Sequence, residues 1–276
     1  MHLQRLLGGH RALLEQEDMA LYLPGVLREG PYPVAEIAAG QADTASADAA
    51  ADLLAGELSA ARLAILSDQN VLGSPFDPAM VHTGRLYPEG HTRLQRVLDG
   101  LGLDNARVFV GLRDPSETMV SAYSQRVMAR GYAPFEQVFG DLDPCTLSWC
   151  DLALRLRDAP AVSEVICWRY EDYPRIARRI LRAMLPPEVA AQMIVQSFEP
   201  EAPLSARAEA QMAEAHAGGA APDAERARAV RDAFPSGPDH DPFRPFDAGL
   251  MADSGRYYAE DLEDLAGQQG VVLLSP

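Results

Sequence analysis

Residues 107–126 of the chain read RVFVGLRDPSETMVSAYSQR, and this stretch decides the fold class that we expect. The apolar run at 108–112 predicts a buried strand. Asp114 followed by Pro115 is a typical helix start, so a helix is expected to run on to about Arg130. In an open parallel sheet, ligands bind beyond the carboxyl ends of the strands, where helices begin. Arg113 is therefore expected at a ligand-binding edge.

Strands and helices alternate on either side of this stretch. LAILSDQNVLG (63–73) predicts a short apolar strand that ends in polar residues, and SEVICWRYEDY (163–173) predicts a third strand. Strands that alternate with helices are typical of an α/β fold with a parallel sheet covered by helices on both faces. The expected helices lie at 3–17, 46–62, 92–101, 115–130, 147–158 and 174–185, and a loop is expected at 22–33.

The chain is expected to form a single domain over residues 1–276, because it shows neither an internal repeat nor a clear boundary. Residues 200–245 are expected to form an excursion, because Ala/Glu/Arg-rich helices alternate there with AGGAAP and FPSGPDHDPFRPF. The tail SGRYYAEDLEDLAGQQGVVLLSP predicts one more helix and a short apolar end. These C-terminal helices are additions to the α/β core.

The charge balance limits the ligands that the chain is expected to bind. Forty acidic and 24 basic residues give a net charge of −16, which repels nucleic acid and anionic membrane surfaces. An anionic ligand would need a local basic pocket. All the basic residues are arginine, which excludes chemistry that demands a lysine. No run has the length of a membrane span and the start lacks a secretory signal, so we expect a cytoplasmic protein.

The three cysteines are expected to be reduced thiols. Cys145, Cys150 and Cys167 cannot all pair with one another, and they show neither CxxC nor Cys/His ligand spacing. The sequence therefore predicts neither a disulfide framework nor a metal site.

Arg113 and Ser121 are candidates for a phosphate clamp. A guanidinium can grip a phosphate at two oxygens, and a serine hydroxyl adds a directional donor beside it. Ser121 is expected about one and a half turns into the helix that follows Arg113. In the alternative interpretation, Arg113 pairs with Asp114 or Glu117 while Ser121 packs against the sheet. The spacing by itself leaves both interpretations open.

The segment FVGLRDPSETMVSAY resembles the 3′-phosphate-binding segment of sulfotransferases that use 3′-phosphoadenosine 5′-phosphosulfate (PAPS). LAILSDQNVLG is similar to the strand and polar turn that precede it in the bacterial carbohydrate-type members. The resemblance covers most of the chain apart from the Ala-rich insertions. It extends to HLQRLLGGHRALL, SWCDLALRLRD, VICWRYEDY and YYAEDLEDLA, which follow in the same order as in that family.

The resemblance implies a P-loop-like parallel sheet and a specific reaction. Arg113 and Ser121 would hold the 3′-phosphate of PAPS, and a sulfuryl group would pass to a hydroxyl or amine of a saccharide-type acceptor. The family normally opens with a strand and a glycine-rich loop of the type GxxKTGTT, which cradles the 5′-phosphosulfate. Here the helix HLQRLLGGHRALL follows Met1 directly, so the first strand and the phosphate loop are missing from the sequence as written.

Three explanations for the missing loop remain open. The start codon was assigned too late, the gene is a truncated copy, or the protein binds a ligand without catalysis. We favour the first two, because loss of a central strand would leave edge groups unpaired and apolar faces uncovered. The alternative function is a non-catalytic nucleotide-binding or interaction protein derived from a sulfotransferase. A nucleotide kinase is disfavoured, because the sequence has no GxxxxGK[ST].

Asp68 is the first candidate for the general base of the implied reaction. At the turn after LAILS, relatives commonly carry a glutamate where this chain has Gln69, and an amide cannot accept the proton. His82 and His91 are the next candidates. In the alternative interpretation, Asp68 caps a turn and both histidines face solvent.

Further residues are assigned mainly structural roles. Glu171 and Asp172 could face the same cleft, but capping of the helix near Pro174 is the favoured role. Trp149 and Trp168 are expected in the core.

Two further groups of residues contain arginines. An arginine cluster is expected to be a solvated basic face that could attract an anionic glycan, and Arg256 with Tyr257 is expected before the last helix, where the pair could close over a ligand. The cluster consists of Arg175, Arg178, Arg179 and Arg182.

Overall fold

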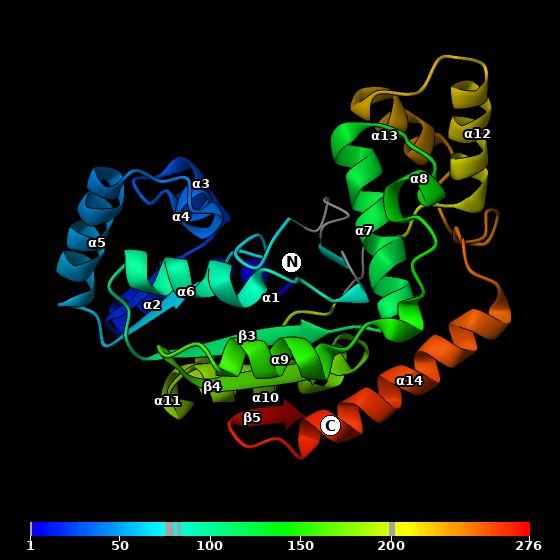
Figure 1. Cartoon of the computed structure of the whole chain (residues 1–276). Helices are drawn as coiled ribbons and strands as arrows, with labels where there is room; N and C mark the ends of the chain where they lie inside the picture. Colours follow the sequence, from blue (N-terminus) through cyan, green and yellow to red (C-terminus); the bar gives the residue numbers. More distant parts are fainter. Residues whose placement is uncertain (1, 75–79, 82–83, 199–201) are drawn as a thin grey trace.

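The computed structural model describes residues 2–74, 80–81, 84–198 and 202–276 (Figure 1). In this part of the chain the fold is α/β, with five strands in two parallel sheets flanked by helices. One sheet has the order β1-β2 and the other the order β3-β4-β5. The strands are β1 (Met19–Tyr22), β2 (Leu63–Leu66), β3 (Ala106–Leu112), β4 (Val162–Arg169) and β5 (Val271–Leu274).

The helices fall into an N-terminal and a C-terminal group. The first group is α1 (His2–Gly9), α2 (Arg11–Gln16), α3 (Pro24–Glu29), α4 (Val34–Ala39), α5 (Thr44–Leu58) and α6 (Gly90–Gly100). The second group is α7 (Pro115–Arg130), α8 (Phe135–Phe139), α9 (Trp149–Arg157), α10 (Tyr173–Met184), α11 (Pro187–Gln192), α12 (Ala206–Ala217), α13 (Ala224–Ala233) and α14 (Ala248–Ala266), with short 3₁₀ turns η2 (Pro144–Thr146) and η3 (Tyr170–Asp172).

The three-stranded sheet is covered on both faces, as the alternation of strands and helices predicted. On β4, Val165 and Cys167 point into the core that contains α7, α9 and α14. The intervening Ile166 and Trp168 point into a second cluster with α10. Figure 1 shows α9 in front of this sheet and α10 behind it. Trp168 is buried against α10 and Trp149 lies in the main core, so the expected packing roles of both tryptophans are confirmed.

The two-stranded sheet was only half predicted. The expected strand at 63 is present as β2, but its partner β1 lies between the expected helix at 3–17 and the expected loop at 22–33, where no strand was predicted. Asp18 adopts φ 54°, which ends the helix and turns the chain into β1. The expected loop at 22–33 contains α3, because Pro24 occupies a first-turn position where its missing N–H costs nothing.

The expected N-terminal helix is divided into α1 and α2. α1 ends at Gly9, and His10 precedes α2 with φ −112° and ψ 19°, outside helical geometry. Gly8 and Gly9 explain the break, because glycine has the weakest helix propensity of the residues other than proline. Leu6, Leu7 and Leu14 still point to the same core beneath β1 and β2.

The excursion at 200–245 shares the main core. α12 and α13 form a helical pair beside α7 in Figure 1. Ala208, Met212 and Ala227 from these two helices are buried in the cluster that contains Tyr123 of α7. The loop after α13 returns to the start of α12 through a bridge between Ser205 and Pro242.

The last helix is longer than expected. α14 begins at Ala248 because the Asp247 side chain accepts a hydrogen bond from the Leu250 N–H and caps it. Arg256 and Tyr257 therefore lie inside this helix and do not precede it, which corrects the sequence-based prediction. Within the described residues, we find no helix with the length and apolar character needed to cross a membrane.

Candidate functional site

The carboxyl ends of three strands meet at one edge of the molecule. Gln4 of α1 donates a hydrogen bond to the carbonyl of Ser67, directly after β2, at 3.2 Å. His2, at the start of the same helix, shares a 2.8 Å hydrogen bond with the Tyr173 hydroxyl, beyond β4. Arg113, directly after β3, lies over the ring of Tyr170 with its guanidinium carbon 5.0 Å from the centroid. The edge at which we expected a ligand is thus formed by β2, β3, β4 and the start of α1.

The backbone at Arg113 is held from two sides. Its carbonyl accepts a hydrogen bond from the Trp149 indole N–H at 2.7 Å and another from the Thr118 hydroxyl at 3.2 Å. Trp149 is buried in the main core, so it connects Arg113 to the rigid interior. The packing role predicted for Trp149 therefore includes positioning of the junction between β3 and α7.

Asp114 caps α7 as predicted. Its carboxylate accepts hydrogen bonds from the Ser116 N–H at 2.8 Å and from the buried Ser254 hydroxyl of α14 at 2.8 Å. The Asp114 N–H donates to Glu171 at 3.3 Å. The turn that carries Arg113 is therefore attached to α14 and to the end of β4.

The Arg113 guanidinium is paired with an acid. It donates to Glu117 at 3.0 Å, as in the alternative interpretation of the sequence. The other carboxylate oxygen of Glu117 accepts a hydrogen bond from Arg244 at 2.8 Å. Ser121 follows one turn later on the same face of α7, half-buried, and accepts a 3.4 Å hydrogen bond from Gln125. Glu117 therefore lies between the two proposed clamp residues.

Sequence reasoning missed Arg244. It lies in the loop FRPF before α14, where no periodic pattern or motif marks it, and it reaches Glu117 across 127 residues of sequence. Tyr170 was also missed as the ring beneath Arg113. Both contacts depend on the tertiary structure, so no local signal in the sequence could have identified them.

Asp68 lies beyond β2, as expected, and its carboxylate is engaged. Arg28 of α3 donates to both of its oxygens at 2.7 and 2.6 Å, and the Asp68 side chain is only 4% exposed. The hydrogen bond with Asp68 raises the pKa of Arg28. Asp68 also accepts a hydrogen bond from the Asn70 N–H at 2.8 Å, which is the turn-capping geometry of the alternative interpretation. Both oxygens of the Asp68 carboxylate are therefore hydrogen-bonded to Arg28.

Of the two histidine candidates, the structure describes only His91. His91 is exposed on α6 and shares a hydrogen bond with the Thr92 hydroxyl at 3.2 Å. His82 lies outside the described residues. Gln69 accepts a 3.4 Å hydrogen bond from Gln4, which places this amide beside the start of α1.

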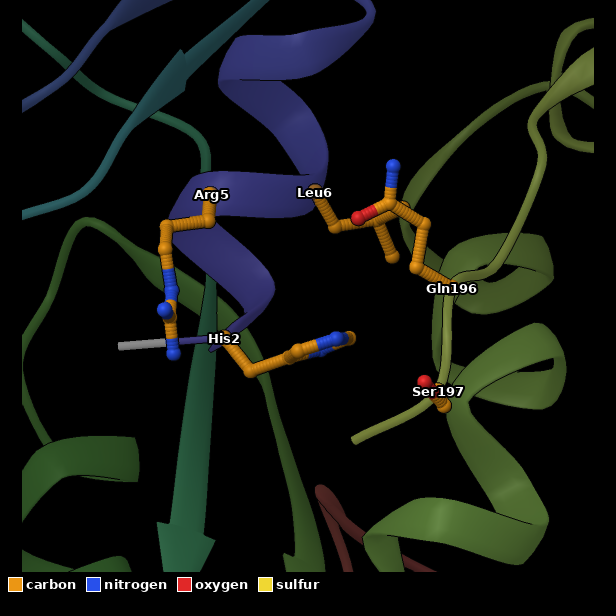
Figure 2. A pocket seen from close by; sticks show the side chains of 5 residues that line it. All are labelled: His2, Arg5, Leu6, Gln196 and Ser197. Atoms are coloured by element: carbon orange, nitrogen blue, oxygen red, sulfur yellow. The ribbon is translucent and has the colours of Figure 1, made fainter. Parts of the chain in front are cut away.

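A hollow of about 260 Å³ lies beside α1 (Figure 2). Figure 2 shows the His2 side chain extending from α1 toward the segment of Ser197, while Arg5 points to the other side of the helix. Burial and the nearby Arg5 lower the pKa of His2. The hollow is lined by His2, Arg5, Leu6, Gln196 and Ser197.

Aromatic rings connect this hollow to Arg113. The His2 ring packs edge-on against Phe198 with centroids 5.4 Å apart, and Phe198 packs against Tyr170 at 5.6 Å. Tyr170 is the ring beneath the Arg113 guanidinium. The hollow and the clamp residues therefore belong to one continuous edge of the molecule.

Asp172 does not cap α10, contrary to the favoured role. It occupies the N-cap position with ψ −14°, outside the extended conformation that lets a side chain reach back to the first turn, and makes no capping hydrogen bond. Its nearly buried carboxylate instead pairs with Arg175 and lies 3.9 Å from Arg169. Glu171 faces the junction and accepts from Asp114 and, at 3.5 Å, from the Tyr258 hydroxyl.

The arginine cluster on α10 is an exposed face, as predicted. Arg175 pairs with Asp172, and Arg179 donates to the Ser275 carbonyl at 2.6 Å. Arg178 and Arg182 are exposed on the same helix. Arg256 on α14 pairs with Asp253 and Glu260 and covers the ring of Tyr257. These contacts are typical of a solvated helix surface.

All three cysteines are free thiols. Burial raises the pKa of Cys145 to about 11 and that of Cys167 to about 12. Burial also raises the pKa of Cys150. Among the residues that the structure describes, no group of three or more His, Cys, Asp and Glu side chains is arranged to hold a metal ion.

Comparison of the chain with protein-family models, with curated proteins and with solved structures finds no match.

Proposed function

We propose that this chain is a sulfotransferase-like protein that binds PAPS at the edge formed by the carboxyl ends of β2, β3 and β4. Arg113 and Ser121 hold the 3′-phosphate, and the sulfuryl group passes to a hydroxyl or amine of a saccharide-type acceptor. The proposal includes a P-loop-like identity for the fold. The sequence resemblance supports the family assignment, and the position of Arg113 at the end of β3 supports the proposed location.

The position of Arg113 is the observation that carries the proposal. Arg113 directly follows the last residue of β3, and its side chain is 31% exposed, so a ligand at this edge can reach the guanidinium. Trp149 and Thr118 hold its backbone, which limits the entropy lost when a ligand binds. A planar guanidinium donates two parallel hydrogen bonds to a phosphate, which a lysine cannot do.

The separation of the two sheets also supports the P-loop-like part of the proposal. β2 is hydrogen-bonded only to β1 within the described strands, and β3 only to β4. α1 begins at the same edge and contacts the residues that follow β2 and β4. The start of α1 and the carboxyl ends of β2 and β4 therefore lie together, as the P-loop-like part of the proposal requires.

The residues at this edge would have different roles in the reaction. In sulfuryl transfer, the sulfur–oxygen bond to the 5′-phosphate breaks while a bond to the acceptor oxygen or nitrogen forms, and the acceptor proton moves to a base. Asp68 is the proposed base that takes this proton. Arg113 and Ser121 touch the nucleotide and keep the phosphosulfate in place.

A second function, nucleotide binding without transfer, is favoured by one observation. Asp68 is the candidate base that the structure describes at this edge. Its side chain is 4% exposed and accepts two hydrogen bonds from Arg28. Both carboxylate oxygens of Asp68 therefore already contact a protein group, which favours a structural role for this side chain. The nucleotide-binding part of the proposal does not depend on Asp68.

Calorimetric titration with adenosine 3′,5′-bisphosphate tests the nucleotide-binding part. Adenosine 5′-monophosphate is the matched ligand, because it lacks only the 3′-phosphate. We expect Arg113→Ala to weaken binding of the bisphosphate about 10-fold or more and to leave the monophosphate nearly unchanged, as expected when a charge-assisted hydrogen bond is lost. Ser121→Ala should act in the same direction with a smaller effect.

Arg62→Ala is the matched control, because Arg62 is an exposed arginine paired with Glu188 before β2, at the opposite end of that strand. If Arg113→Ala and Arg62→Ala bind the bisphosphate equally well, the site assignment is wrong. Transfer of labelled sulfate from PAPS to a panel of saccharides then separates the two functions. Binding without transfer would select the non-catalytic one.

A further inference from the structure

Two arginines and one carboxylate form a compact group at the start of α7. Glu117 uses one oxygen for Arg113 at 3.0 Å and the other for Arg244 at 2.8 Å. Arg113 follows β3, whereas Arg244 comes from the loop between α13 and α14. The two guanidinium groups therefore approach the same small anion from different parts of the fold.

Two guanidinium groups that converge on one point can also bind a larger anion such as phosphate. A phosphate presents more acceptor oxygens than a carboxylate, and guanidinium groups bind it with charge-assisted hydrogen bonds. The three side chains Arg113, Arg244 and Glu117 together carry a charge of +1, while the nearby carboxylates of Asp114 and Glu171 are held by other groups of the junction. The two converging guanidinium groups, and not the overall field of the chain, would attract an anion here.

The group is accessible to a ligand. The side chains of Arg113 and Glu117 are each 31% exposed, and that of Arg244 is 50% exposed. An exposed ion pair of this kind contributes little to stability, so its replacement by a ligand costs little. Ser121 lies one turn beyond Glu117 on the same helix face, where its hydroxyl can reach an anion that takes the place of the glutamate.

We propose that Arg244 is a second phosphate-binding arginine and that Glu117 is a resident carboxylate that the 3′-phosphate must displace from Arg113 and Arg244. The inference rests on the proposed function, because it assigns the ligand at the same site. The bound form has the phosphate between the two guanidinium groups, with Glu117 turned toward solvent. Glu117 thus competes with the ligand and lowers its affinity.

Removal of the competing charge tests this inference. In Glu117→Gln the side chain keeps its size but loses the charge that pairs with the arginines and repels the phosphate. We expect the affinity for adenosine 3′,5′-bisphosphate to rise about 10-fold and the affinity for adenosine 5′-monophosphate to stay within about twofold. Arg244→Ala should weaken bisphosphate binding about 10-fold, for the same electrostatic reason.

Matched controls come from the exposed pair Arg62–Glu188, whose nitrogen–oxygen distance is 3.1 Å. Glu188→Gln on α11 and Arg62→Ala before β2 make the same chemical changes in this distant pair and should leave the affinity unchanged. Thermal melting of every variant checks that the fold is kept.

The outcomes distinguish the two proposals. If Arg113→Ala weakens bisphosphate binding but Glu117→Gln and Arg244→Ala match the wild-type protein, the inference about Glu117 and Arg244 is overturned and the proposed function stands. If neither the wild-type protein nor Glu117→Gln binds the bisphosphate, both are overturned. Tighter binding by Glu117→Gln together with weaker binding by Arg244→Ala supports both.

Discussion

The carboxylate of Asp261 holds the start of α9 from the neighbouring helix α14. It accepts hydrogen bonds from the backbone N–H groups of Trp149 at 2.7 Å and Cys150 at 3.1 Å, and from the Ser148 hydroxyl at 2.5 Å. The Ser148 hydroxyl in turn accepts from the Asp151 N–H at 2.9 Å. Asp261 therefore satisfies two of the N–H groups that every helix leaves unpaired in its first turn.

Asp261→Ala should destabilise the protein by about 2–3 kcal/mol. A hydrogen bond to a charged acceptor contributes about 1.5–3 kcal/mol, and two backbone donors lose their acceptor together. The sum is reduced because Asp261 is only half-buried, so water can replace part of the lost interaction. Asp261→Asn keeps one acceptor oxygen and should cost about 1 kcal/mol. For a chain of this size, the alanine variant should melt roughly 3–5 °C lower.

Thermal unfolding followed by circular dichroism measures this effect, with Asp264→Ala as the control. Asp264 is an exposed acid one turn away on α14, and its replacement should change stability by less than about 0.5 kcal/mol. If Asp261→Ala and Asp264→Ala have the same melting temperature, the Asp261 carboxylate does not stabilise α9 and the reasoning fails.

Two further predictions concern titratable groups. Burial raises the pKa of Cys145 to about 11 and that of Cys167 to about 12. Iodoacetamide at pH 8 should therefore modify Cys145 about 100-fold more slowly than an ordinary thiol, and Cys167 only after unfolding. Mass spectrometry of the protein checks this, and rapid labelling of Cys167 in the folded protein would contradict it. Tyr132→Phe removes the hydroxyl that donates to Glu209 at 2.9 Å, and burial already raises the pKa of Glu209. A raised carboxyl pKa means that stability falls as pH rises through it, so the variant should lose about 1–2 kcal/mol at pH 7 and less at pH 4 in urea unfolding. An equal loss at both pH values would refute this account.

Much of the α/β core was predictable from local patterns. The strands β2, β3 and β4 follow apolar runs, and α7 and α10 follow clear start signals and periodic apolar positions. These elements are long or strongly patterned, so local propensity and tertiary packing favour the same conformation. β1 was missed because four apolar residues between two short helices show neither alternation nor a turn signal.

The candidate site was predictable only in part. The location of Arg113 follows from the end of β3 and the cap at Asp114, both of which are local features. Its partners do not, because Glu117 and Arg244 meet it only when α7 and the loop before α14 are brought together. The ion pair between Arg28 and Asp68 could not be predicted from the sequence either, since the two residues lie 40 positions apart.

By itself, the sequence determined which segments become strands and helices around residue 113, and it placed an arginine where a strand ends and a helix begins. Local hydrogen bonding and the spacing of apolar residues decide such features, and both depend only on residues that are close together in the sequence. Only the tertiary structure decided which charges face that arginine. Coulomb interactions depend on distance in space, and the distance between residues far apart in sequence is set by packing of the whole chain.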